Sequence, residues 1–157
     1  MSGLVIDVSR EDDAWPPVDD LIEEAVGRAL AVAGLAHATG AELSIVLTND
    51  AGIRQVNGAW RGKDKATNVL SFPAVPPAEI AAAPLLGDII LARETIAAEA
   101  TEAGRRFQDH LSHLVVHGLL HVFGYDHENE ADAQIMETLE TRILAELGIA
   151  DPYADAA

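Results

Sequence analysis

Three histidines in one short stretch of the chain have the spacing of a metal-binding site. His117 and His121 are four residues apart, and His127 follows six residues later. On an α-helix, residues i and i+4 point to the same side, so the first two imidazoles could reach one ion. Gly124 could end the helix with a positive φ and turn the chain so that His127 supplies a third ligand. Three neutral imidazoles with a position left for water are typical of catalytic zinc sites.

The residues around this motif leave alternatives open. The three histidines could be ordinary core or surface residues, although the glycine in the gap makes that interpretation the weaker one. His113 lies one helical turn before His117, but three successive residues at this spacing do not easily reach one ion, so His127 is the preferred third ligand. Asp126 could orient a histidine or could be a surface residue. The other two histidines are expected to be exposed and without a role: His37 and His110.

The residue after the first histidine is Gly118. In the zincin peptidases, whose extended signature H-E-x-x-H-x-x-G-x-x-H has the same histidine spacing, this position holds the glutamate that activates the zinc-bound water. Glycine has no side chain that could accept a proton, so peptide hydrolysis by that mechanism is not expected. Either the metal is structural, or it serves a reaction such as phosphodiester cleavage, in which a metal polarises a phosphoryl oxygen and an arginine neutralises developing charge.

The charge of the chain is strongly negative overall but positive in one window. The formal net charge is -16, which argues against general binding to nucleic acid, and DNA is not an expected partner. Residues 51–73 are the exception, because they contain four basic residues and one acidic residue: Arg54, Arg61, Lys63, Lys65 and Asp64. This window is either a solvated loop or a local anion-binding patch.

The length and composition of the chain bound its fold class and its location. A chain of 157 residues with 49% hydrophobic residues is expected to form a single domain over residues 1–157. No apolar run is long enough to span a membrane, and the N-terminus does not resemble a signal peptide. The absence of cysteine excludes disulfides and thiolate ligands and is consistent with a cytoplasmic protein.

The hydrophobic periodicity predicts an α+β domain with a small mixed sheet of about four strands packed with about five helices. The long helix that carries the first two histidines is expected to resemble the metal-binding helix of zincins. The proline-rich segment 73–84 is expected to be a loop, and residues 151–157 a frayed tail. Strands are predicted at 4–8, 43–47, 69–72 and 87–91, and helices at 18–33, 49–60, 94–103, 108–123 and 130–147.

Three sequence blocks resemble the YbeY family of metal-dependent bacterial endoribonucleases. Residues 117–127, HGLLHVFGYDH, are similar to the family signature H-G-x-L-H-x-x-G-Y-D-H. Residues 57–73, NGAWRGKDKATNVLSFP, are similar to the block N-x-x-(aromatic)-R-x-K-x-x-x-T-D-V-L-S-F-P, with Asn68 in place of the usual aspartate. Residues 86–90, LGDII, match a third block. The blocks occur in the family's order, and the resemblance covers nearly the whole chain.

The resemblance implies a site and a substrate. It implies one zinc ion on His117, His121 and His127, a functional arginine at Arg61, and single-stranded RNA as substrate. It further implies roles in 16S ribosomal RNA 3′-end processing and in ribosome quality control. Two lysines of the basic window are weaker candidates for phosphate contacts: Lys63 and Lys65.

The sequence leaves the mechanism and one rival function open. No residue is identified as the general base, and the attacking group could be a metal-bound water or the RNA 2′-hydroxyl. The rival is a ribosome-assembly factor with a mainly structural zinc, whose acidic termini would contact basic ribosomal proteins. A zinc peptidase is the third and weakest hypothesis, because of Gly118. No membrane partner is expected.

Overall fold

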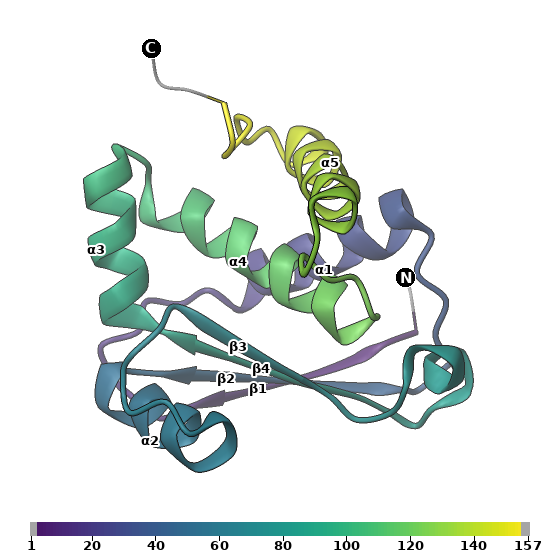
Figure 1. Cartoon of the computed structure of the whole chain (residues 1–157), viewed down its shortest axis with the longest axis horizontal. Coiled ribbons are helices and arrows are strands. Elements are labelled where there is room, and N and C mark those ends of the chain that lie inside the picture. The colour runs from purple at the N-terminus through teal and green to yellow at the C-terminus, as the bar shows by residue number, and fades with distance from the viewer. Residues whose placement is uncertain (1–2, 155–157) are drawn as a thin grey trace.

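A four-stranded mixed sheet runs through the middle of the molecule in the computed structural model, which describes residues 3–154 (Figure 1). The strand order is β1-β2-β4-β3. β1, β2 and β4 are parallel, whereas β3 is an edge strand and runs antiparallel to β4. The predicted α+β class with a small mixed sheet of four strands is therefore confirmed. The strands are β1 (Val5–Arg10), β2 (Glu42–Thr48), β3 (Val69–Pro73) and β4 (Leu85–Ala92).

Within residues 3–154, five α-helices pack around the sheet. α1, α4 and α5 lie on one side of it and α2 on the other, with α3 beside the first group (Figure 1). Proline residues and acidic first-turn residues mark the start of α1, and Gly34 ends it in a left-handed conformation. Asn49 caps α2 by accepting a hydrogen bond from Gly52 N (2.8 Å). The helices are α1 (Asp19–Ala33), α2 (Asp50–Arg61), α3 (Arg93–Ala103), α4 (Phe107–Val122) and α5 (Glu130–Glu146).

The sheet packs against α4 through alternate residues of its central strands. Leu43, Ile45 and Leu47 of β2 are fully buried, as are Ile89 and Leu91 of β4. Because alternate residues of a strand point to opposite faces, these side chains form one apolar layer under the helices. On the other face, α2 contributes a smaller cluster with β3 and β4, built from Ile53, Leu70 and Ala92. α4 is thus held on a rigid base, which matters because it carries the first histidines.

Three local predictions differ from the structure. Within the segment 73–84, Pro73 ends the edge strand β3, and a 3₁₀ helix, η1 (Pro77–Ala82), follows, because an edge strand and a 3₁₀ turn both tolerate proline. The helical pattern also predicts Ile135 on the apolar stripe of the helix at 130–147, but the buried stripe of α5 contains Met136, and Ile135 is 55% exposed. Within the predicted tail, Asp151 accepts hydrogen bonds from Thr141 Oγ1 and Tyr153 N. Residues 155–157 lie outside the described part.

A search of residues 3–154 for a helix long and apolar enough to cross a bilayer finds none.

Candidate metal centre

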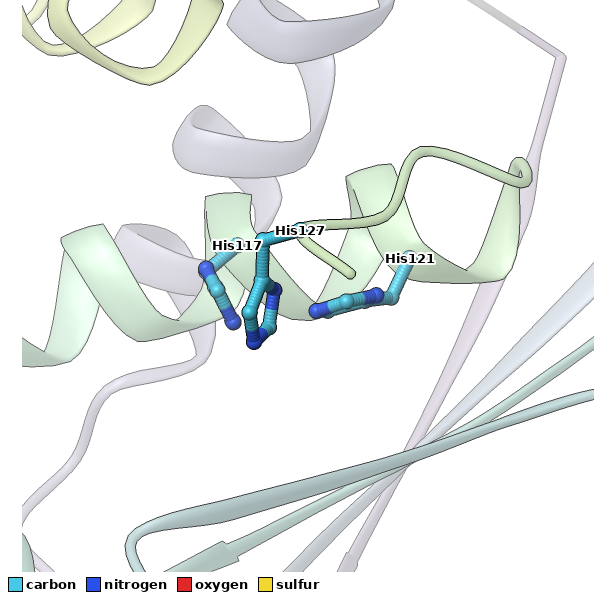
Figure 2. A group of neighbouring side chains, drawn as sticks. All are labelled: His117, His121 and His127. Atoms are coloured by element: carbon cyan, nitrogen blue, oxygen red, sulfur yellow. The ribbon is translucent and has the colours of Figure 1, made fainter. Parts of the chain in front are cut away.

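The three predicted ligands come together at the end of α4. His117 and His121 project from successive turns of α4, and His127 returns to them from the following turn (Figure 2). The ring centroids are 4.6 Å apart for His117 and His121, 5.0 Å for His121 and His127, and 5.6 Å for His117 and His127. One nitrogen of each ring lies within 4.8 Å of the corresponding nitrogens of the other two. The group could therefore hold a metal ion.

Gly124 makes the return of His127 possible. It has a φ of 100°, and its backbone N–H donates to the carbonyl oxygen of His121 (2.9 Å). The amide of Tyr125 donates to the carbonyl of Leu120 (3.0 Å), so the last turn of α4 closes on itself. Asp126 Oδ1 then accepts from the backbone amide of His127 (2.7 Å). Of the two roles considered for Asp126, its exposure fits that of a surface residue, although its negative charge also acts on His121 and raises the pKa of that imidazole.

A buried glutamate, which the sequence did not reveal as a site residue, orients His117. Glu140 of α5 is fully buried, and its Oε2 accepts a hydrogen bond from Nδ1 of His117 (2.9 Å). Its Oε1 accepts from Nε2 of His113 (2.7 Å). A carboxylate that accepts a hydrogen bond from Nδ1–H favours the tautomer in which Nε2 of His117 keeps a free lone pair, which is the form a metal ligand needs.

Glu140 stays ionised because its partners outweigh its burial. Burial by itself raises the pKa of the Glu140 carboxyl, but hydrogen bonds from His113, His117 and Tyr153 lower it to about 2. Tyr153 belongs to the C-terminal segment, and its hydroxyl donates to Glu140 Oε1. Burial and the charge of Glu140 raise the pKa of Tyr153 well above its ordinary value, so the phenol keeps its proton. His113 is therefore a neighbour of the site through Glu140 and not a member of the ligand group.

Gly118 lies on the side of α4 that faces the sheet. A Cβ atom at this position would lie 2.9 Å from Cγ2 of Ile89 and 3.0 Å from Oγ of Ser71. Both distances are shorter than ordinary van der Waals contact, so any larger residue would push α4 off β3 and β4. Close packing thus explains why glycine stands at position 118, where zincins have a glutamate: this site has no room for the general base that zincins use.

An open cavity of about 720 Å³ connects the histidines to the basic window. Arg61, the last residue of α2, reaches this cavity from the far side of the edge strand β3. Lys63 and Lys65 are exposed on the loop after α2 and are not part of the wall. The lining residues are Arg61, Asn68, Val69, Ser71, Pro73, His117, His121, Gly124, Tyr125, Asp126, His127 and Glu128.

Asn68, the departure from the family block, has a partner that explains it. Its Nδ2 donates to Oε1 of Glu99 (2.9 Å), and its Oδ1 accepts from the amide of Val69 (2.7 Å). An aspartate here would present a second carboxylate to Glu99, whereas an amide can donate. Glu99 Oε1 also lies 2.8 Å from Nε2 of His110. The prediction that His110 is exposed was therefore wrong, because its side chain is 14% exposed and pairs with Glu99.

The donor set fits a transition metal such as zinc. Burial and, after it, the charges of His117 and His127 together lower the pKa of His121 to about 4, so its imidazole is neutral at pH 7. Neutral imidazole is the ligand form for zinc, nickel, copper and iron. No carboxylate or thiolate belongs to the group that the described residues form. Three imidazoles would leave a coordination position free for a substrate or a water.

The chain is similar to known proteins over almost its full length. The family model for Endoribonuclease YbeY matches residues 7–148. The Endoribonuclease YbeY of Rhizobium johnstonii is 51% identical over 163 residues, covering 98% of this chain and 95% of that protein. That of Rhizobium meliloti is 51% identical over 166 residues, covering 99% and 98%. The solution structure of TM1509 from Thermotoga maritima shares the fold, with a TM-score of 0.59 at 21% identity, and covers 96% of this chain and 100% of that one. The chain belongs to the YbeY endoribonuclease family.

Proposed function

We propose that this protein is a zinc-dependent endoribonuclease that cleaves single-stranded RNA. The observation that carries the proposal is the common cavity of Arg61 and the three histidines, which brings a fixed cation and a metal-binding group to one place. Membership of the YbeY family supports the reaction class. The absence of a glutamate at Gly118 separates the site from peptidases of the same histidine spacing.

In this proposal each residue has a separate task. His117, His121 and His127 hold the ion, and Glu140 keeps His117 in the tautomer with a free Nε2. A divalent ion held by these three histidines would supply Lewis acidity to the reaction. The planar guanidinium of Arg61 binds phosphate oxygens and stabilises the charge that develops on them during cleavage. Lys63 and Lys65 lie outside the cavity and contact phosphates farther along the strand.

The proposed biological role is the maturation of ribosomal RNA. It consists of 16S ribosomal RNA 3′-end processing and ribosome quality control in the cytoplasm, with the ribosome or its proteins as partners and no DNA substrate. A net charge of -16 would repel free nucleic acid, so delivery to its RNA by a basic ribosomal protein is part of the proposal.

The alternative is a ribosome-assembly factor in which the zinc is mainly structural. The acidic surface favours it, since binding to basic proteins needs no cleavage. Against it stands the position of Arg61, because a purely structural ion does not require a cation across an open cavity.

Cleavage by matched variants tests the proposal. Protein purified without added metal is analysed for bound elements, with about one zinc per chain as the expected result. The metal-loaded protein is then incubated with a single-stranded RNA that spans a 16S 3′ end. Wild type should cleave it, and His121→Ala and Arg61→Ala should each lose that activity while staying folded. Arg54→Ala is the control, because Arg54 lies in the same basic window but forms an ion pair with Asp64 (2.7 Å).

The products identify the nucleophile. A 2′,3′-cyclic phosphate terminus would exclude direct attack by water. A 5′-phosphate on the downstream fragment would mean attack by water, because attack by the RNA 2′-hydroxyl always leaves a 5′-hydroxyl there. Folded Arg61→Ala and His121→Ala proteins that cleave as well as wild type would refute the proposed site. A wild-type protein that binds zinc but does not cleave would favour the assembly-factor alternative.

A further inference from the structure

The side chain of Trp60 is exposed, although the fold does not require an exposed indole at this position. Its side chain is 75% exposed, the highest value among the large hydrophobic residues of the described chain. The second tryptophan, Trp15, is 5% exposed and donates a hydrogen bond from Nε1 to the carbonyl of Thr48 (2.7 Å). An indole left in water at the end of a helix contributes little to folding, so a binding role must be considered.

Trp60 lies across the edge strand from the metal centre. It directly precedes Arg61, and its ring packs on Phe72 of β3 with a centroid distance of 6.3 Å and an interplanar angle of 56°. The neighbours of Phe72 on the strand, Ser71 and Pro73, line the cavity on the opposite face. Because successive strand residues point to opposite faces, the indole and the cavity are separated by the width of one edge strand. Arg61, the residue after Trp60, lines the cavity, so these two neighbours reach the two faces of β3.

The charges around Trp60 favour a polyanion over a polypeptide. Arg54 is neutralised by Asp64, with Nε of Arg54 2.7 Å from Oδ1. No ion pair among the described residues involves Arg61, Lys63 or Lys65. An apolar protein surface would need further exposed apolar side chains beside the indole, and α2 and the loop after it offer none among the large hydrophobics. A flat ring among unpaired cations suits a ligand that alternates aromatic faces with phosphates.

We propose that Trp60 binds a nucleobase of single-stranded RNA by stacking, next to the nucleotide whose phosphate Arg61 contacts. The inference rests on the proposed function and adds to it a base-binding subsite outside the cavity. The RNA strand would cross the edge of the sheet at β3, with one base stacked on the indole of Trp60 and the adjacent phosphate in the cavity. Stacking accepts every base, because each has an aromatic face, so the subsite gives affinity and register without sequence preference.

Equilibrium binding of a short 2′-O-methyl oligoribonucleotide to the zinc-loaded full chain tests the subsite, and a gel after each titration verifies that the RNA is intact. Trp60→Ala should weaken binding by about 5- to 150-fold, the range for loss of one stacked base, and Trp60→Phe should keep most of the affinity. RNA should quench the tryptophan fluorescence of wild type but not that of Trp60→Ala, where only the buried Trp15 remains. Ile135→Ala removes another exposed apolar side chain and is the control, with unchanged binding expected.

An abasic oligomer with the same phosphates separates stacking from charge. Wild type should bind the abasic oligomer as weakly as Trp60→Ala binds intact RNA, because the abasic oligomer offers no base to stack. If Trp60→Ala binds intact RNA like wild type, the stacking inference is wrong, and the indole is left for a protein partner. If Trp60→Ala weakens the binding of the intact and the abasic oligomer equally, the loss of affinity is not due to stacking, and the inference is again wrong. If wild type cleaves RNA in either case, the proposed function stands; if wild type neither binds nor cleaves RNA, both fail.

Discussion

Glu140 is the residue on which the orientation of His117 depends, and an amide in its place tests that role. In Glu140→Gln the shape is kept, but the amide has one acceptor oxygen in place of two, so it cannot accept from both His113 and His117. Where the NH₂ group faces Nδ1 of His117, the proton moves to Nε2 and blocks a metal. We expect metal affinity to fall by about 10- to 100-fold, the usual effect of losing a partner that orients a ligand. Competition with a chromophoric chelator measures the affinity, and ¹⁵N NMR of the metal-free protein identifies the tautomer of His117.

Glu137→Gln provides the matched control for this prediction. Glu137 lies on the same helix, one turn earlier, and is exposed. Its substitution removes the same charge without touching the hydrogen bonds of His117, so metal affinity should not change. A Glu140→Gln protein with wild-type affinity and an Nδ1-protonated His117 would show that the carboxylate is merely structural.

The protonation of His121 gives the metal-free fold a defined pH dependence. Burial, followed by the charges of His117 and His127, lowers the pKa of His121 from 6.5 to about 4. Between these values the unfolded chain binds a proton that the folded chain does not, so the free energy of unfolding decreases as pH falls from 6.5 to 4. Above pH 6.5 the residue is neutral in both states and contributes nothing. Glu140 affects the free energy of unfolding at lower pH. Its pKa is lowered from 4.5 to about 2, so its contribution to stability is lost as pH falls between these values.

Urea denaturation from pH 4 to pH 7.5 separates the histidine from other groups. Metal-free wild type should lose more stability than His121→Asn over the window from pH 6.5 to pH 4, and the two should differ by a constant amount above it. Parallel curves across the whole range would contradict the lowered pKa of His121.

The sequence predicted that His117, His121 and His127 lie together, but not the glutamate that contacts His117. His117 and His121 share a helix face, and Gly124 ends the helix so that His127 can return to them. The clustering of the three histidines therefore depends on local geometry, which the spacing of residues along the chain predicts. Glu140 is 23 residues from His117, and their contact depends on how α5 packs against α4. One signal was available: Glu140 falls on the buried stripe of α5 that contains Met136, Ile143 and Leu144. A lone carboxylate on an apolar stripe indicates a buried partner.

At the scale of elements, Gly118 determines how closely α4 approaches the sheet. Gly118→Ala would place a methyl group 2.9 Å from Cγ2 of Ile89 and 3.0 Å from Oγ of Ser71. Overpacking of this kind typically costs about 1–3 kcal/mol and exceeds the gain of up to about 1 kcal/mol from helix propensity. We therefore expect a lower free energy of unfolding, measured by urea denaturation, and weaker metal binding.

Gly27→Ala is the control for Gly118→Ala. Gly27 lies within α1, and a Cβ there would meet nothing within 4 Å. The same chemical change should then stabilise the protein by up to about 1 kcal/mol through propensity alone. Equal effects at the two glycines would refute the claim that close packing requires Gly118.

The elements with strong periodicity were the ones that the sequence predicted. All four strands and all five α-helices were expected near their observed positions, because alternation and helical stripes are local signals. The placement of β3 at the edge, beyond β4, was not predicted, since strand order depends on contacts between distant segments. The same limit applies to residues 151–154, which bind through Tyr153 to Glu140 and lack a periodic pattern.

At the scale of the whole molecule, the uneven charge should make RNA binding depend on the metal. The charged residues of the cavity wall, apart from histidines, are Arg61, Asp126 and Glu128, so without an ion the wall is net negative. A divalent ion on three neutral imidazoles reverses that sign in the one region where a phosphate must enter. Metal removal should therefore weaken the binding of uncleaved RNA on the order of tenfold or more, even though no cleavage is measured.

Glu128→Gln tests whether this dependence is electrostatic. Removing one negative charge from the wall should strengthen RNA binding, and more so in the metal-free protein, where that charge is uncompensated. Glu102→Gln on the exposed side of α3 removes the same charge away from the cavity and should have little effect at 0.15 M salt, where charges more than about 8 Å apart are largely screened. Fluorescence anisotropy with a 2′-O-methyl RNA, at two salt concentrations and with or without zinc, measures the RNA affinity of wild type and of both variants. Equal affinity with and without zinc would mean that the ion acts on the reaction alone and that the acidic wall does not oppose RNA.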